Sequence, residues 1–322
     1  MEKSLGKETT LELGYLGSGG FHLQRAHLIN NALPGAGAIQ PRRPIQKMSF
    51  VPGTVLPSNV TVLNPNNPLI TPVSSVNLLE NTAQSWYDAG YVNLRRRYAR
   101  GLSLLANYTY AKSLSNAPDF RSPMYESAIP QNDNDLQAER GPACDIRHRF
   151  ALSGVYNVPA WSHSRLSTLV TENWRASTIY QVQSGYPLTI SVFGDTANAG
   201  TALGENPIRA NRTGKPIFGP GTRSANEWMN PTAFAAPPAY TFGNVGRNSV
   251  YGPGMQTLDA GIVRLFNLTE RLKFEGRGEF FNALNHTNLG TPNRFVNTSG
   301  FSTITSVMTP GRQIQVSARI LF

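Results

Sequence analysis

The sequence predicts an all-β protein, a portion of an antiparallel transmembrane β-barrel with about eight strands, long external loops and short periplasmic turns. Three features predict this fold. Apolar and polar side chains alternate with a period of two, the connections alternate between long and short, and the last strand ends on an aromatic residue. Because no break in composition interrupts these features, we expect residues 1–322 to form one barrel unit.

The last strand, at residues 313–322, shows the clearest pattern, because polar and apolar side chains alternate without interruption up to the C-terminal Phe322. An aromatic end is a common finish of outer-membrane barrels, in which the last strand pairs with the first to remove the sheet edge. We predict that the apolar side chains of this closing strand face lipid: Ile314, Val316, Ala318, Ile320 and Phe322.

Charged residues follow one face of the segment 271–284, while the other face is apolar or glycine. In a barrel such a charged face lines a wet lumen, where side chains of opposite sign can pair across strands. The predicted lumen-facing residues are Lys273, Glu275, Arg277 and Glu279.

The same periodicity predicts strands at residues 9–16, 84–97, 102–113, 148–158, 166–183, 256–266, 271–284 and 313–322. Arg264 falls on the apolar parity of the segment 256–266, which indicates a β-bulge or an arginine at the level of the lipid headgroups.

The connections between these strands alternate in length. Short turns are predicted at residues 98–101, 159–165 and 267–270, and long segments with little periodicity at 17–83, 114–147, 184–255 and 285–312. Loops of such length argue against a compact soluble domain, but outer-membrane barrels carry them on their external side.

The net charge of +10 and the pI near 9.9 are compatible with nucleic acid or anionic lipid as a partner. The basic residues are nevertheless scattered, and the densest cluster, Arg95 to Arg97 with Arg100, lies at a strand end. We predict no nucleic-acid partner. Cys144 is the only cysteine, which excludes an intrachain disulfide, and no apolar run reaches the roughly 18 residues of a membrane-spanning helix.

No arrangement of residues indicates an enzyme, a cofactor or a metal site. The glycines between Gly14 and Gly20 lack the lysine of a phosphate-binding loop and favour a turn or a flexible strand end. Oxygen-rich residues 132–135, with Asp119, Glu126 and Glu139, have the ligand type that calcium prefers, but a solvated loop is the better interpretation because the distal glutamate and the glycine of an EF-hand are missing.

Aromatic residues occur among prolines in the longest predicted loop, and two interpretations stay open for them. They contact a ligand, or they pack the loop onto the barrel rim. The candidates are Trp228, Phe234, Tyr240 and Phe242.

Four stretches resemble the C-terminal half of the barrel of TonB-dependent outer-membrane receptors, most closely the Oar-like type that carries a carboxypeptidase-regulatory-like domain. They are residues 11–23, 101–113, 138–141 with 145–150, and 272–288, the last with its Glu-Phe-Phe-Asn-Ala-Leu-Asn-His core. The resemblance implies a barrel of about 22 strands that encloses an N-terminal plug. Residues 1–322 then correspond to the C-terminal portion of such a barrel, without plug or signal peptide.

The resemblance further implies TonB-dependent uptake of an unknown solute by the longer protein, with TonB contacting the N-terminal part that this sequence does not include. The expected partners are outer-membrane lipid and the barrel-assembly machinery, which reads the C-terminal strand. The expected location is the Gram-negative outer membrane, although the first residues do not form a signal peptide. The alternative is a soluble or surface-attached β-rich binding module, similar to an adhesin.

Overall fold

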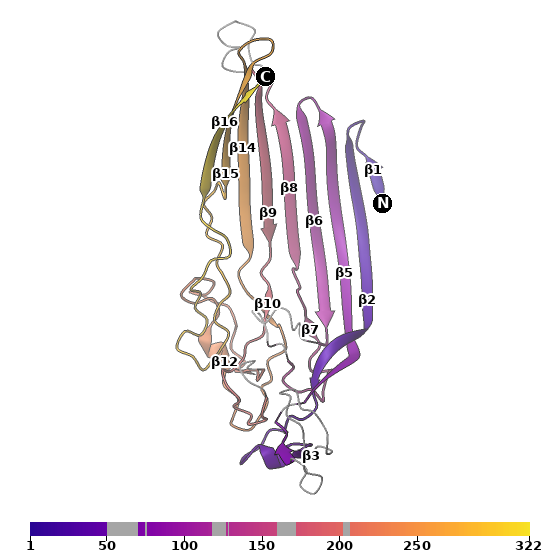
Figure 1. Ribbon diagram of the computed structural model, residues 1–322, viewed down its shortest axis with the longest axis vertical. Helices are drawn as coiled ribbons and strands as arrows, with labels where there is room; N and C mark the ends of the chain where they lie inside the picture. The colour runs from indigo at the N-terminus through magenta and orange to yellow at the C-terminus, as the bar shows by residue number, and fades with distance from the viewer. Residues whose placement is uncertain (50–69, 75, 118–126, 128, 160–171, 202–206) are drawn as a thin grey trace, which may run out of the picture.

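A computed structural model describes residues 1–49, 70–74, 76–117, 127, 129–159, 172–201 and 207–322. Its main feature is one antiparallel sheet of long strands (Figure 1). In order across the sheet the strands are β1 (Glu2–Ser4), β2 (Thr9–Leu28), β5 (Asn77–Ala99), β6 (Leu102–Ser115), β8 (His148–Asn157), β9 (Trp174–Gln183), β14 (Met255–Asn267), β15 (Lys273–Phe281) and β16 (Gln313–Leu321), while β7 (Gly141–Pro142) pairs with β6.

The antiparallel all-β fold predicted from the sequence is confirmed. Within the described residues the sheet is open, because β16 pairs with β15 and β1 pairs with β2 at its two edges. Figure 1 shows the short turns β5–β6 and β14–β15 at one end of the sheet and the long connections at the other. Part of the predicted turn 159–165 and the predicted strand start at residue 166 lie outside the described residues.

The strand register separates two faces of the sheet, because directly opposed residues in neighbouring strands point the same way. One row runs from Val316 through Gly278, Ile262, Ala176 and Tyr156 to Leu102, and we call this side the apolar face. The neighbouring row runs from Gln315 through Glu279, Gly261, Ser177 and Val155 to Ser103, and we call that side the polar face. The period-two pattern of the sequence therefore becomes two chemically different surfaces.

Strand β2 is longer than predicted, because the glycine segment that follows Leu16 continues it to Leu28. Neighbouring aromatic rings cover the missing side chains: the ring of Tyr15 lies over Gly17, and that of Phe21 lies over Gly19. Such coverage compensates for the weak strand preference of glycine. The interpretation of these glycines as a turn was wrong; the chain irregularities occur later, at the register shifts on either side of Leu23.

Arg264 lies in a regular part of β14, opposite Gly276 on one side and Trp174 on the other, so the alternative of a β-bulge at this position was wrong. Its guanidinium stacks on the rings of Trp174 and Phe266, with centroid distances of 5.1 and 4.2 Å. Arg264 therefore lies on the apolar face near the short-turn end of the sheet, where cation–π contacts with the two rings stabilise its charge.

The long connections form a folded structure, which we call the loop cap: residues 29–49, 70–74, 116–117, 127, 129–147, 184–201, 207–254 and 282–312. Short antiparallel pairs join β3 (Lys47–Ser49) to β4 (Ile70–Pro72), β10 (Pro187–Leu188) to β13 (Val250–Tyr251), and β11 (Asn211–Arg212) to β12 (Phe234–Ala235). Two 3₁₀ turns, η1 (Gln40–Arg42) and η2 (Pro231–Ala233), complete it.

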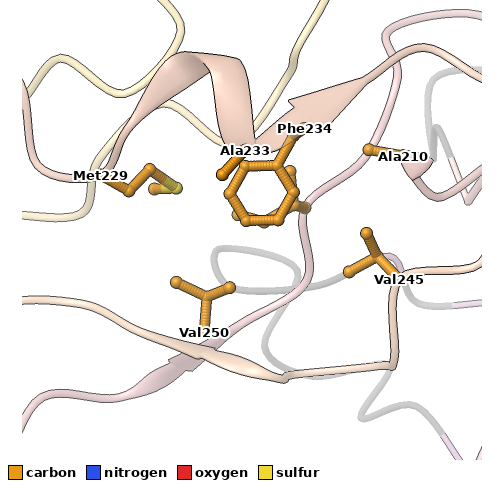
Figure 2. Close-up of a cluster of buried hydrophobic side chains, with 7 residues drawn as sticks. Ala210, Met229, Ala233, Phe234, Val245 and Val250 are labelled. Atoms are coloured by element: carbon orange, nitrogen blue, oxygen red, sulfur yellow. The ribbon is translucent and has the colours of Figure 1, made fainter. Parts of the chain in front are cut away.

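The loop cap has its own hydrophobic core, which Figure 2 shows around the ring of Phe234. The buried members are Ile190, Ala210, Met229, Ala233, Phe234, Val245 and Val250. These residues come from parts of the chain that are far apart in sequence, so the periodicity of the sequence did not predict that they are buried together. The described parts of the long segments are therefore packed structures, and their lack of alternation reflects irregular backbone with buried side chains.

Candidate site on the polar face and in the loop cap

Hydrogen bonds join polar side chains across three neighbouring strands on the polar face. The Glu12 carboxylate accepts hydrogen bonds from the Tyr91 hydroxyl at 2.9 Å and from the Asn93 amide at 3.1 Å, and Asn107 donates to Asn93. The ring of Tyr91 occupies the space above Gly14, where even a methyl group would collide with it. Glycine at position 14 therefore leaves the space that the Tyr91 ring occupies when its hydroxyl donates to Glu12.

The register places Lys273, Glu275, Arg277 and Glu279 on this polar face. Arg277 approaches the carboxylates of Glu275 at 3.2 Å and of Glu279 at 3.7 Å, so its ion pairs run along strand β15. These charges are partly exposed, and exposed pairs contribute little stability. Contact with a lumen or plug by these four residues stays a prediction.

A cavity of about 750 Å³ is hollowed into the polar face. Its polar lining includes Arg95, Ser103, Ser177, Asp259 and Glu279, which come from five different strands. Leu105, Val155 and Ile179 also line it, so the cavity offers a mixed polar and apolar surface with room for a small molecule or a protein segment.

The closing strand β16 presents its apolar side chains on the apolar face. Exposed fractions are 58% for Ile314, 80% for Val316 and 60% for Ile320, and Phe322 is fully exposed. Ala318 lies in the same series, opposite Gly276. Lipid contact by these residues stays a prediction, and their exposure in an unbroken apolar row supports it.

A buried ion pair fastens the loop cap to the wall. The guanidinium of Arg25, near the end of β2, lies 2.6 Å from Glu80 of β5 and 3.4 Å from Asp133 of the cap. Both Arg25 and Asp133 are almost wholly buried. Burial raises the pKa of Asp133, and the nearby His27 and Arg25 oppose that shift.

A second buried ion pair lies inside the cap. Arg209 donates to Glu139 at 3.0 Å, and Gln131 accepts the backbone N–H of Arg209 at 2.8 Å. Burial raises the pKa of Glu139, while the charges of Arg209 and Arg247 oppose the shift. The pair joins the β6–β8 connection to the β9–β14 connection, so it holds two long loops together.

A third group ties the same two loops. Asp145 accepts hydrogen bonds from Arg147 at 2.7 Å and from the hydroxyl of Tyr251 at 2.5 Å. Burial raises the pKa of Tyr251, and its hydrogen bond to Asp145 adds to the shift. These contacts, with the hydrophobic core, give the external end of the molecule a defined shape.

The four predicted aromatic contacts occupy different environments. Phe234 is buried in the cap core, and Trp228 packs against that core while its indole N–H donates to the Tyr251 carbonyl at 2.9 Å. Phe242 packs against a second small cluster with Ala197, Ala199 and Ile208. Tyr240 is 47% exposed, so it is the candidate with a ring available to a ligand.

The oxygen-rich segment 132–135 is committed to internal contacts. Asp133 contacts Arg25, and Asp135 accepts the backbone N–H of Ala138, while Asn132 accepts that of Asn134. Asp119 and Glu126 lie outside the described residues. Over the part of the chain that the structure describes, His, Cys, Asp and Glu form no group of three that suits a metal ion.

Sequence reasoning missed the buried pairs Arg25–Asp133 and Glu139–Arg209. The available signal was the presence of acidic and basic residues in these segments, which does not identify the partners. None of the described helices has the length and apolar character that crossing a membrane requires.

The family described as "Outer membrane beta barrel domain" matches residues 1–315, so the chain belongs to this family. This membership places the sheet in the outer membrane, with the short turns on the periplasmic side and the loop cap outside, as in other barrels of this membrane.

No curated protein matches the chain. A similar solved structure is the outer membrane transporter YddB from Escherichia coli, with 9% identity and a TM-score of 0.47, covering 99% of this chain and 31% of that chain. The chain thus spans less than a third of that transporter's length.

Proposed function

We propose that this chain is the C-terminal portion of the barrel of an Oar-like TonB-dependent receptor, and that the intact protein binds a solute at its external loops and takes it up with energy from TonB. The chain itself performs no catalysis in this proposal. The supporting observation is the division of the molecule into an amphipathic wall and a folded external cap.

The wall supports the transport part of the proposal. Its polar face combines a hydrogen-bonded ladder around Glu12 with the charged row of Arg277 and a cavity of about 750 Å³. A water-filled or plugged lumen needs such a surface, while lipid needs the apolar row that includes Val316. We assign the charged row to contact with a plug.

The closing strand β16 supports two partners. Its exposed apolar residues suit outer-membrane lipid, and the unpaired edge of β16 in the described sheet suits recognition by the barrel-assembly machinery before closure. TonB itself would contact a segment ahead of a plug, outside residues 1–322.

Growth and uptake in the native host test this proposal. Comparative uptake of environmental solutes by wild-type cells, a strain lacking this gene and a strain lacking TonB should identify a solute whose accumulation falls equally in both mutants. Equal accumulation of every solute in all three strains would refute transport. A solute that binds the surface but does not accumulate would support the adhesin-like alternative.

A further inference from the structure

A pocket of about 710 Å³ opens in the loop cap, away from the buried cap core. Three segments line it: Gly37, the turn of Asp195, Thr196 and Asn198, and the stretch with Pro237, Ala239 and Tyr240. The lining thus combines an aromatic ring, a proline, an amide and a carboxylate.

Hydrogen bonds between the segments hold the pocket in shape. The Asn198 amide donates to the carbonyls of Gly35 and Gly37, at 2.8 Å each. Asp195 accepts the backbone N–H groups of Ala199 and Gly200, at 3.1 and 2.6 Å. A site built this way loses little freedom when a ligand binds.

Tyr240 presents its ring from an unusual backbone conformation. Its φ of 64° lies in the left-handed region, which a bulky residue rarely adopts, and its N–H donates to the Thr196 carbonyl at 3.0 Å. Its neighbour Phe242 packs into the cap, whereas the Tyr240 ring is 47% exposed. Backbone strain of this kind concentrates at ligand-binding positions.

We propose that this pocket binds one ring of a neutral saccharide, which deepens the proposed function by naming the class of solute. The apolar C–H face of a sugar ring stacks on Tyr240, and the sugar hydroxyls donate to the amide oxygen of Asn198 and to the remaining lone pairs of the Asp195 carboxylate. An anion is disfavoured by the Asp195 carboxylate. A cation is disfavoured because Asp195 supplies a single carboxylate, and the backbone N–H groups of Ala199 and Gly200 already offset part of its charge.

Calorimetric titration tests the proposal, using the protein purified from outer membranes in detergent and three probes: maltotriose, cellotriose and xylotriose. At least one should bind. Tyr240→Asn removes the ring while keeping a residue type that tolerates the left-handed conformation. We expect this variant to bind about tenfold more weakly, the loss expected for a stacking contact, and Tyr240→Phe to bind as the wild type does.

Tyr110→Ala, a change at an exposed tyrosine of the wall, should leave binding unchanged. Failure of all three trisaccharides to bind, or equal binding by wild type and Tyr240→Asn, would overturn the proposal. The two proposals fail differently. Saccharide binding without TonB-dependent uptake would refute transport alone, while uptake of another solute with no saccharide binding would refute the pocket assignment alone.

Discussion

Glu139 and Arg209 are separated by 70 residues of sequence, yet their side chains meet at 3.0 Å in a place where both are nearly inaccessible to water. They connect two long loops of the cap, and the backbone N–H of Arg209 is bonded in turn to Gln131. A buried pair of this kind is costly to break, because the remaining charge stays in a poorly solvated site.

Arg209→Met should therefore destabilise the cap by about 3–5 kcal/mol, the usual cost of leaving one partner of a buried pair uncompensated. The double variant Glu139→Leu with Arg209→Met should recover most of that loss. Urea unfolding of the refolded barrel in detergent, followed by fluorescence in a variant whose other three tryptophans are replaced by phenylalanine so that Trp228 reports alone, measures the effect. Lys215→Met, an exposed change in the same loop, serves as the control. Equal stability of Arg209→Met and the control would contradict the role of the pair.

The buried carboxylates also predict how cap stability depends on pH. The pKa values of Glu139 and Asp133 are raised by burial, so the folded cap holds protons that the unfolded chain releases. Their contribution is fully present below the unfolded pKa values of about 4 and is lost as the pH rises through the raised folded values.

Unfolding midpoints measured from acidic to neutral pH check this dependence. Relative to Glu139→Gln with Asp133→Asn, the wild-type cap should lose stability as pH increases across that window. A constant difference between the two proteins would show that these carboxylates do not control the pH response.

The strands of the wall were largely predictable, because the alternation of apolar and polar residues is a local pattern that neighbouring positions show by themselves. In the segment 313–322, the apolar and the polar face can both be identified without knowing which strand pairs with it. The extension of β2 through Gly17 and Gly19 was missed because glycines carry no pattern, and the rings of Tyr15 and Phe21 that cover them act only once the strand exists.

The cap could not be predicted in the same way. Ile190 and Val250 share one core although 60 positions separate them, and the irregular backbone between them gives no period. For the same reason the sequence did not distinguish the buried Phe234 from the exposed Tyr240. The aromatic residue type was visible, but its environment depends on long-range packing.

The apolar face predicts opposite effects at adjacent residues of β16. Val316 is 80% exposed on that face, while Ser317 follows it on the polar face. Val316→Arg should cost about 2–4 kcal/mol if the side chain lies near the bilayer midplane, because charge on the lipid face is poorly tolerated there. Ser317→Arg should have little effect. Reversible folding into phospholipid vesicles compares them, and equal costs would refute the assignment of the two faces.

Gly14 offers a test of the polar ladder. A Cβ at this position would lie 2.2 Å from the ring of Tyr91, so Gly14→Ala must displace that ring from Glu12. Overpacking and the lost hydrogen bond together should cost about 1–3 kcal/mol. The control is Gly90→Ala, in the neighbouring strand, where an added Cβ meets nothing within 4 Å.

Removing the ring first should make the same glycine change harmless. In a Tyr91→Ser background, Gly14→Ala should cost less than about 0.5 kcal/mol, because the two changes act through one contact and are therefore not additive. Folding free energies of the four proteins in the cycle measure this coupling. If Gly14→Ala costs the same with and without the Tyr91 ring, the glycine is required for a reason other than access of Tyr91 to Glu12.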